Sequence, residues 1–165
     1  MNLRYIVVGV VAVGVAVTTA IFLFSSEEKK VKKQFRLLSE GISKETHESA
    51  FAMAQKMQRL GTLFTDPCEI TLSVPTGSGS FSPEEIVAYA AQARLQCSEL
   101  SLTFFDLHVT FPEPQKASVT TTGKVTGTLP TGERIDETRE VVCGLTKIDD
   151  RWCFNKIEVI DVLKK

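Results

Sequence analysis

The dominant period of the hydrophobic pattern in this chain changes close to residue 100. Before that point apolar residues recur every three or four positions, which is the spacing of one helix face. After it they alternate with polar residues, which is the spacing of a half-buried strand. Short turns at Pro130-Thr131-Gly132 and Asp149-Asp150 divide the alternating part. The pattern therefore predicts an α+β fold, with helices packed on one face of an antiparallel sheet.

Three helices are predicted ahead of the main sheet. The first has one apolar stripe, made of Val31, Phe35, Leu38 and Ile42. The second covers residues 50–66 and stops at Asp66-Pro67. The third starts at Ser82-Pro83-Glu84-Glu85, where Ser82 is the N-cap and Glu85 closes a capping box.

A short strand over residues 68–74 and a loop over residues 75–80 separate the second and third helices. Four strands are predicted after the third helix, over residues 100–111, 117–129, 134–147 and 152–162, and the last contains Trp152 and Phe154. The expected order is helix, helix, strand, helix and four strands.

The segment from Tyr5 to Phe24 contains no charged residue. A helix of roughly 20 apolar residues spans the hydrocarbon core of a bilayer. The alternative is a cleavable signal peptide, for which Thr18 and Ala20 form a small-residue cleavage site. The apolar run continues through that site, which favours an uncleaved anchor. The sequence thus predicts a single-pass transmembrane anchor over residues 1–25 and a folded domain over residues 26–165.

The anchor is followed by a basic collar, made of Lys29, Lys30, Lys32, Lys33 and Arg36. The collar is either a solvated flank or a contact with anionic lipid headgroups. Its cations favour a cytoplasmic domain, whereas the short N-terminus ahead of the anchor is typical of a signal anchor. We expect a cell (inner) membrane protein whose domain lies outside the cytoplasm.

The formal net charge of −1 argues against a nucleic-acid partner. The four cysteines, Cys68, Cys97, Cys143 and Cys153, contain no Cys-x-x-Cys pair, and neither histidine lies at ligand spacing, so no metal site or other cofactor is predicted. Strand register disfavours a Cys143–Cys153 disulfide, while a Cys68–Cys97 disulfide stays open.

The chain resembles the nuclear transport factor 2-like superfamily over about residues 27–163. Three features carry the resemblance: Phe64-Thr65-Asp66 before the short strand, Ser82 to Ile86 at the start of the third helix, and the closing pattern from Val141 to Val159. The resemblance implies a cone-shaped cavity between the helices and the sheet. It leaves function open, because this superfamily includes isomerases, dehydratases, cyclases and binding modules.

Enzymes of this superfamily use a carboxylate in the cone, with a tyrosine, acid or histidine partner. The corresponding candidates here are Asp66, Tyr89, Asp106 and His108. Asp106 and His108 lie two residues apart on one predicted strand, so they should share a face. Tyr89 falls on the predicted buried stripe of the third helix, and Asp66 has a simpler role in the turn before Pro67.

These observations favour a non-enzymatic, membrane-tethered domain that binds a partner protein or a small apolar ligand. Its architecture is similar to that of inner-membrane scaffold components of type IV secretion systems. The alternative is a tethered isomerase or hydrolase that acts on a small hydrophobic substrate with Asp106 and His108.

A row of threonines with a single charge lies on the predicted outer face of the strand over residues 117–129. The row, here the threonine face, contains Thr120, Thr122, Lys124, Thr126 and Thr128. A freely solvated strand face usually carries more charge, and threonine rows pack well against a second sheet. We therefore expect a homodimer through the threonine face.

Overall fold

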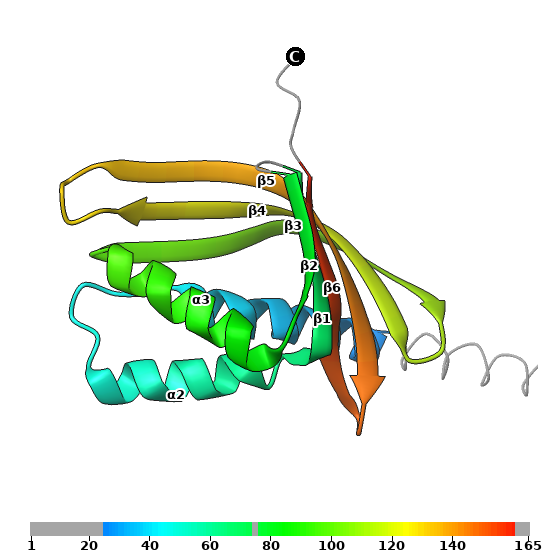
Figure 1. Ribbon diagram of the computed structural model, residues 1–165. Coiled ribbons are helices and arrows are strands. Elements are labelled where there is room, and N and C mark those ends of the chain that lie inside the picture. The colour runs from blue at the N-terminus through cyan, green and yellow to red at the C-terminus, as the bar shows by residue number, and fades with distance from the viewer. Residues whose placement is uncertain (1–24, 74–75, 161–165) are drawn as a thin grey trace, which may run out of the picture. The chain divides into compact units, whose positions relative to one another are not determined.

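The computed structural model describes residues 25–73 and 76–160 (Figure 1). The predicted anchor, Tyr5 to Phe24, lies outside these residues, so it stays a prediction. Within the described residues, no helix combines the length and the apolar character needed to cross a bilayer. The larger of the two compact units begins at Val31.

The unit contains three described helices. Residues 31–42 form the first, α2 spans Ala50–Gly61 and α3 spans Pro83–Gln96. The predicted capping box of α3 is confirmed: the Glu85 backbone N–H donates to Ser82 Oγ at 3.2 Å, and the Ser82 N–H donates to the Glu85 carboxylate at 2.8 Å. These bonds satisfy amides that a helix start otherwise leaves unpaired.

Six strands form one sheet in the spatial order β2-β1-β6-β5-β4-β3. Their bounds are β1 Phe64–Ser73, β2 Thr76–Phe81, β3 Glu99–Glu113, β4 Lys116–Thr128, β5 Arg134–Ile148 and β6 Arg151–Ile160. The sheet is curved, and the helices cover its concave face (Figure 1). The predicted α+β class and the placement of Trp152 and Phe154 on the last strand are confirmed.

The sheet differs from the prediction in one pairing. β1 lies beside β6, and the two run parallel, with Ile70 opposite Ile157. The other described pairs are antiparallel. The chain can make this pairing because α3 and four strands, β2 to β5, intervene between β1 and β6, which leaves ample length for a crossover.

Two predicted boundaries were wrong. Phe64-Thr65-Asp66 belongs to β1 rather than to the end of a helix, because α2 stops at Gly61. The expected loop over residues 75–80 is largely β2, which pairs antiparallel with β1. Glycine and serine are poor strand formers on their own, so β2 owes its conformation to hydrogen bonds with its neighbour rather than to local propensity.

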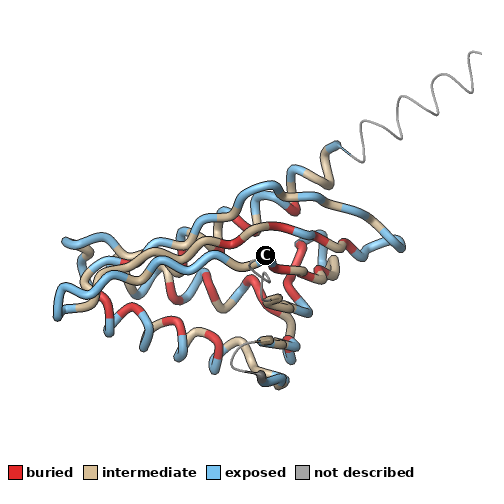
Figure 2. The backbone as a smooth tube through the Cα atoms, turned by 90° about the horizontal axis from the view of Figure 1, so that it is seen from above, coloured by how far each residue is buried: buried red, intermediate tan, exposed pale blue. Residues whose placement is uncertain are grey.

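The core lies between the helices and the concave face. Figure 2 shows buried residues recurring along the helices. Buried residues alternate with less buried ones along the first half of β4 and the second half of β5. Phe154 of β6 is fully buried, and its ring meets Phe35 of the first helix edge to face, with centroids 5.1 Å apart. The same ring lies 5.8 Å from that of Phe64. Phe154 therefore joins the first helix to two neighbouring strands.

A buried ion-pair cluster holds the segment between the first helix and α2 against α3. Arg94 of α3 is 1% exposed, and its guanidinium donates to the carbonyls of Gly41, at 2.9 Å, and Ser43. It also pairs with the Glu48 carboxylate, whose other oxygen lies 2.6 Å from Lys56 Nζ. Burial by itself would raise the pKa of Glu48, but the hydrogen bonds from Lys56 and Arg94, together with their charges, hold it below its ordinary value.

Register shifts interrupt several of the strand pairs, and two of them change a predicted facing. One lies between Phe105 and His108 of β3, where Asp106 adopts a φ of 55°. The other lies between Gly144 and Leu145 of β5, opposite Asn155, so Cys143 faces Ile157 instead of the Lys156 that a regular hairpin predicts. An extra residue in one strand shifts every later side chain relative to its partner, and no sequence alternation reveals it.

Candidate functional site: an apolar cavity in the cone

An apolar hollow of about 430 Å³ lies between the helices and the concave face. The first helix contributes Leu38 and Ile42, and α3 contributes Ile86 and Ala90. The sheet supplies the floor: Phe64 and Ile70 from β1, Leu102 and Phe104 from β3, Gly123 and Val125 from β4, Val141 from β5, and Ile157 and Val159 from β6. The implied cone is thus present and keeps open space.

Polar side chains on this lining are confined to Tyr89, Glu137 and Arg139. Glu137 and Arg139 precede Val141 on β5 at intervals of two, so they continue its core-facing row. Their charged groups lie 2.8 Å apart, and the side chains are 56% and 36% exposed. The ion pair therefore stands at the rim of an otherwise apolar cavity.

Gly123 of β4 contributes to the open volume of the cavity because it has no side chain. A side chain built there would place its Cβ 3.2 Å from Val141 Cγ2 and 3.6 Å from the ring of Phe104. The first distance is closer than ordinary van der Waals contact. The absence of a side chain at Gly123 leaves cavity space above the strand.

A second apolar hollow, also of about 430 Å³, lies over the β1–β2 hairpin. It shares Ile70, Ile86 and Tyr89 with the first. The Tyr89 ring stands edge to face against that of Phe81, with centroids 5.9 Å apart. The two hollows therefore meet along the N-terminal half of α3.

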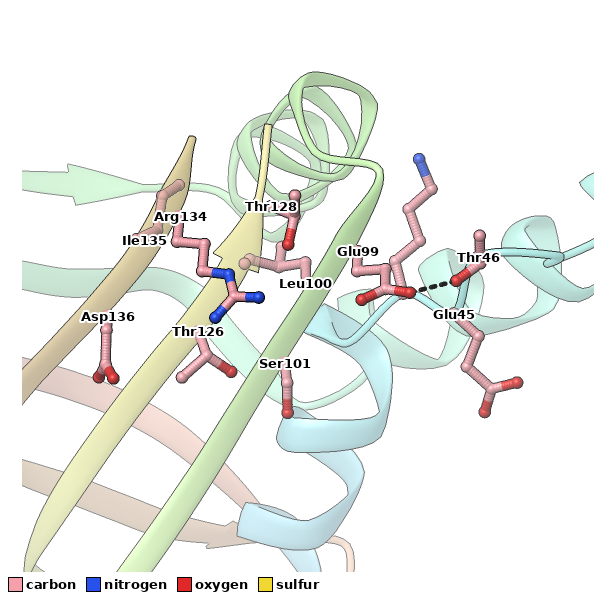
Figure 3. Close-up of a pocket in the computed structure, with 12 residues that line it drawn as sticks. Glu45, Thr46, Glu99, Leu100, Ser101, Thr126, Thr128, Arg134, Ile135 and Asp136 are labelled. Atoms are coloured by element: carbon pink, nitrogen blue, oxygen red, sulfur yellow. Dashed lines mark hydrogen bonds between the residues drawn. The ribbon is translucent and has the colours of Figure 1, made fainter. Parts of the chain in front are cut away.

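A polar hollow of about 450 Å³ lies elsewhere, where β3, β4 and β5 meet the segment before α2. Figure 3 shows Arg134 over β4 beside Thr126, with Glu45 and Thr46 across β3. Thr46 donates a hydrogen bond to the Glu99 carboxylate. Its lining mixes cations and carboxylates with the apolar residues Leu100 and Ile135, whereas the apolar cavity has charged groups only in Glu137 and Arg139, so we take the apolar cavity as the candidate site.

The structure does not bring the four predicted catalytic candidates together. Asp106 and His108 are both exposed, and neither lines any of the hollows described above. Regular alternation of β3 would place Asp106 and His108 on the same face. The bulge at Asp106 interrupts that alternation. Asp66 is exposed on β1.

Tyr89 is 60% exposed, so its predicted place on a buried stripe was wrong. The buried stripe of α3 consists of Ile86, Ala90 and Arg94. Tyr89 instead borders both apolar hollows. Sequence reasoning missed Glu137 and Arg139, although counting back by twos from Val141 would have found them.

Of the threonine face, Thr120 is exposed and the other four residues are half-buried, while Ala117, Val119 and Thr121 on the opposite face of β4 are buried. Lys124 pairs with Asp136 of β5 at 3.1 Å. Self-association through this face stays a prediction. In the basic collar, Lys32, Lys33 and Arg36 are exposed on the first helix.

All four cysteines are free and buried, so the structure contains no Cys68–Cys97 disulfide. Burial, with a smaller contribution from Glu69, raises the pKa of the Cys68 thiol to about 11. Burial also raises the pKa of Cys143 to about 12. Protonated thiols are poor nucleophiles, so these residues act as core side chains.

The cavity can therefore bind but offers little for acid–base chemistry. The side chains that line its interior are apolar. The carboxylate at its rim, that of Glu137, is exposed and paired with Arg139. No group of three or more metal-ligating side chains occurs among residues 25–73 and 76–160. The geometry suits a molecule held by its hydrocarbon part.

No family model matches the sequence, and no curated protein matches it. Solved structures do. The Kfla4162 protein of Kribbella flavida is 10% identical with a TM-score of 0.70, over 82% of this chain and 90% of that one. The hexachlorocyclohexane dehydrochlorinase LinA type 3 of Novosphingobium barchaimii is 14% identical with a TM-score of 0.65, over 81% and 85%.

A third similar structure comes from Streptomyces avermitilis and is named as a dehydratase of the NTF2-like family. It is 12% identical with a TM-score of 0.67, over 85% of this chain and 99% of that one. At these identities the likeness establishes the fold, which is nuclear transport factor 2-like. It does not transfer an activity.

Proposed function

We propose that this domain is a non-enzymatic binding module that holds a small apolar molecule in the cavity between its helices and its sheet. The observation that carries the proposal is the lining: a hollow of about 430 Å³ whose polar side chains stand only at the rim. Ligand sites in proteins have this size and this mostly apolar character. Burial of ligand hydrocarbon supplies the affinity, at about 25 cal/mol per Å² removed from water.

Some structural neighbours bear the names of enzymes, a dehydrochlorinase and a dehydratase. An enzyme on this frame would need a base that reaches a bound substrate. The alternative that uses Asp106 and His108 lacks this support, because both residues are exposed outside the cavity lining. The binding proposal therefore takes precedence.

The proposal is tested by filling the cavity. Val125 lies on its floor, and Val125→Phe places a ring in the open space. We expect this variant to weaken binding of the neutral dye N-phenyl-1-naphthylamine by tenfold or more, measured by fluorescence titration of the full-length protein.

The matched control is Val142→Phe. Val142 is half-buried on β5 and does not line the cavity, so this variant should bind the dye within twofold of the wild type. Ala90→Leu fills the same cavity from α3 and repeats the test if Val125→Phe does not fold. Unchanged binding in a folded, filled variant, or no binding by the wild type, would reject the proposal.

We further propose that the domain is tethered to a membrane by residues 5–24, on the strength of their uncharged apolar sequence alone. The full-length protein should stay in the membrane pellet after an alkaline carbonate wash. The double variant Val11→Arg, Val15→Arg should move to the supernatant, since each central arginine costs about 2.5–3.5 kcal/mol on insertion. Gln34→Arg, outside the apolar run, is the control. Release of the wild type would contradict the tether.

A further inference from the structure

The two apolar hollows lie side by side and share three lining residues. Ile70, Ile86 and Tyr89 line both of them. The first hollow reaches β3 through Leu102, and the second reaches β2 through Phe81. Because β2 and β3 are the two edges of the sheet, the combined space crosses all of its strands. We call this space the long groove.

Neighbouring strands lie about 4.8 Å apart, so the five intervals from β2 to β3 cover roughly 24 Å along the sheet, and the three intervals from β2 to β5 roughly 14 Å. A compact ring system would occupy one hollow and leave the other empty. A flexible hydrocarbon chain can follow the curvature and fill both. The shape of the long groove thus favours an elongated ligand over a compact one.

Charge on the groove lining is restricted to one region. Among the described residues of both linings, Arg139 is the single cation and Glu137 the single carboxylate. Arg139 also donates to the Thr138 carbonyl at 3.1 Å. The β1–β2 hairpin contributes side chains such as Leu72 and Phe81 and the backbone of Gly77 and Gly79. The groove is therefore charged near β5 and uncharged toward β2.

We propose that the long groove binds a single-chain carboxylate amphiphile, a fatty acid, with its carboxylate on Arg139 and its tail directed toward β2. This inference rests on the proposed function and specifies its ligand. A guanidinium presents parallel N–H donors that match a carboxylate. Glu137 is the more exposed partner of the present pair, so it can turn into solvent when the ligand carboxylate takes its place.

The first test is the chain length of the ligand. Saturated fatty acids from 8 to 18 carbons compete with N-phenyl-1-naphthylamine for the full-length protein, with the Val125→Phe variant as the blank for lipid partition. Affinity should rise about fourfold for each added methylene until both hollows are full.

The variant Leu72→Asp tests the second hollow independently of the first. Leu72 lines the second hollow and not the first, so the variant should weaken the 16-carbon acid tenfold or more and leave the 8-carbon acid within twofold. The matched control is Ile148→Asp. Ile148 is also an exposed aliphatic residue, 44% against 38% for Leu72, and lies outside both linings.

The head group is tested with three ligands of equal length: the acid, the alcohol and the amine. The wild type should prefer the acid. Arg139→Gln should remove that preference, and Glu137→Gln should increase it, because the competing carboxylate is gone. An amine preference that Glu137→Gln removes would overturn the assignment of the head group.

The outcomes separate this inference from the proposed function. If the wild type binds the dye but shows no gain beyond the 8-carbon acid, the elongated ligand is wrong and the binding function stands. If the wild type binds neither, both fail. If affinity rises with chain length equally in Leu72→Asp, the tail does not lie over the β1–β2 hairpin and the proposed orientation is wrong.

Discussion

Replacing Arg94 with methionine is expected to lower the free energy of unfolding by about 3–5 kcal/mol, which is the range for breaking a buried ion pair by removing one partner. The Glu48 side chain is 6% exposed, so its carboxylate would remain in the interior with only Lys56 beside it. The carbonyls of Gly41 and Ile42 would lose this donor at the same time, and that of Ser43 would keep only the hydrogen bond from Lys56 Nζ. Urea unfolding at neutral pH measures the loss.

A double variant separates the contribution of the ion pair to stability from the contribution of the hydrogen bonds to these carbonyls. Glu48→Leu combined with Arg94→Met removes the stranded charge, so it should recover part of the loss, whereas the carbonyls stay without their donor. Arg59→Met, at an exposed position near the end of α2, is the matched control and should change stability by less than about 0.5 kcal/mol. A loss below about 1 kcal/mol in Arg94→Met would mean that the cluster stabilises little.

The pH dependence gives an independent readout. The pKa of Glu48 is held below the ordinary glutamate value of 4.5, so the unfolded chain takes up this proton first as the pH falls. Its contribution is therefore present above about pH 4.5 and is lost as the pH drops through the lower, folded-state value. The stability difference between the wild type and Glu48→Gln should shrink over that acidic range.

Replacing Phe154 with alanine is expected to lower the free energy of unfolding by about 3–5 kcal/mol. The ring is fully buried and contacts Phe35 and Phe64. Its removal leaves a cavity where the first helix, β1 and β6 meet, and rigid strands relax poorly around such a space. Thermal and urea unfolding measure the effect.

Phe51→Ala is the matched control, because Phe51 of α2 is 74% exposed. The same chemical change there should cost less than about 0.5 kcal/mol. Phe154→Leu retains most of the buried volume and should lose much less than Phe154→Ala. Equal effects of Phe154→Ala and Phe51→Ala would mean that the core is misplaced.

The sequence predicted the elements whose own residues determine them. The apolar stripe of the first helix contains Val31, Phe35 and Leu38, which are all buried. The start of α3 is marked in the sequence by the capping box of Ser82 and Glu85. β4 and β5 alternate cleanly enough to identify. In these segments local propensity and burial agree, which is why periodicity is a sufficient guide.

The remaining elements depend on partners far along the chain. β2 is rich in glycine and serine, and its pairing with β1 overrides that local preference. The bulge at Asp106 shifts the facing of later β3 residues without a local sequence signal. The burial of Arg94 was missed because charged residues are assigned to surfaces by default, although Ile86, Ala90 and Arg94 share the spacing of four that defines one helix face.

The candidate site was predicted as a cavity but not in its residues. The resemblance implied a cone, and the structure contains it. Asp106 and His108 were singled out for their chemical type, yet they lie away from the lining. Glu137 and Arg139 were overlooked because charges on a core-facing row contradict the usual pattern, and such contradictions tend to mark functional positions.

The position of β6 has a consequence for how the protein is made on the ribosome. β6 is the last of the described strands in sequence, yet it lies between β1 and β5 in the sheet. While the nascent chain is still short of residue 151, it can form a β1–β2 hairpin and a β3–β4–β5 meander, but nothing joins them. Each piece then exposes an unpaired strand edge, which invites pairing with other chains. Emergence of β6 closes both edges in one step, so productive folding of the whole sheet must wait until synthesis of this strand is complete.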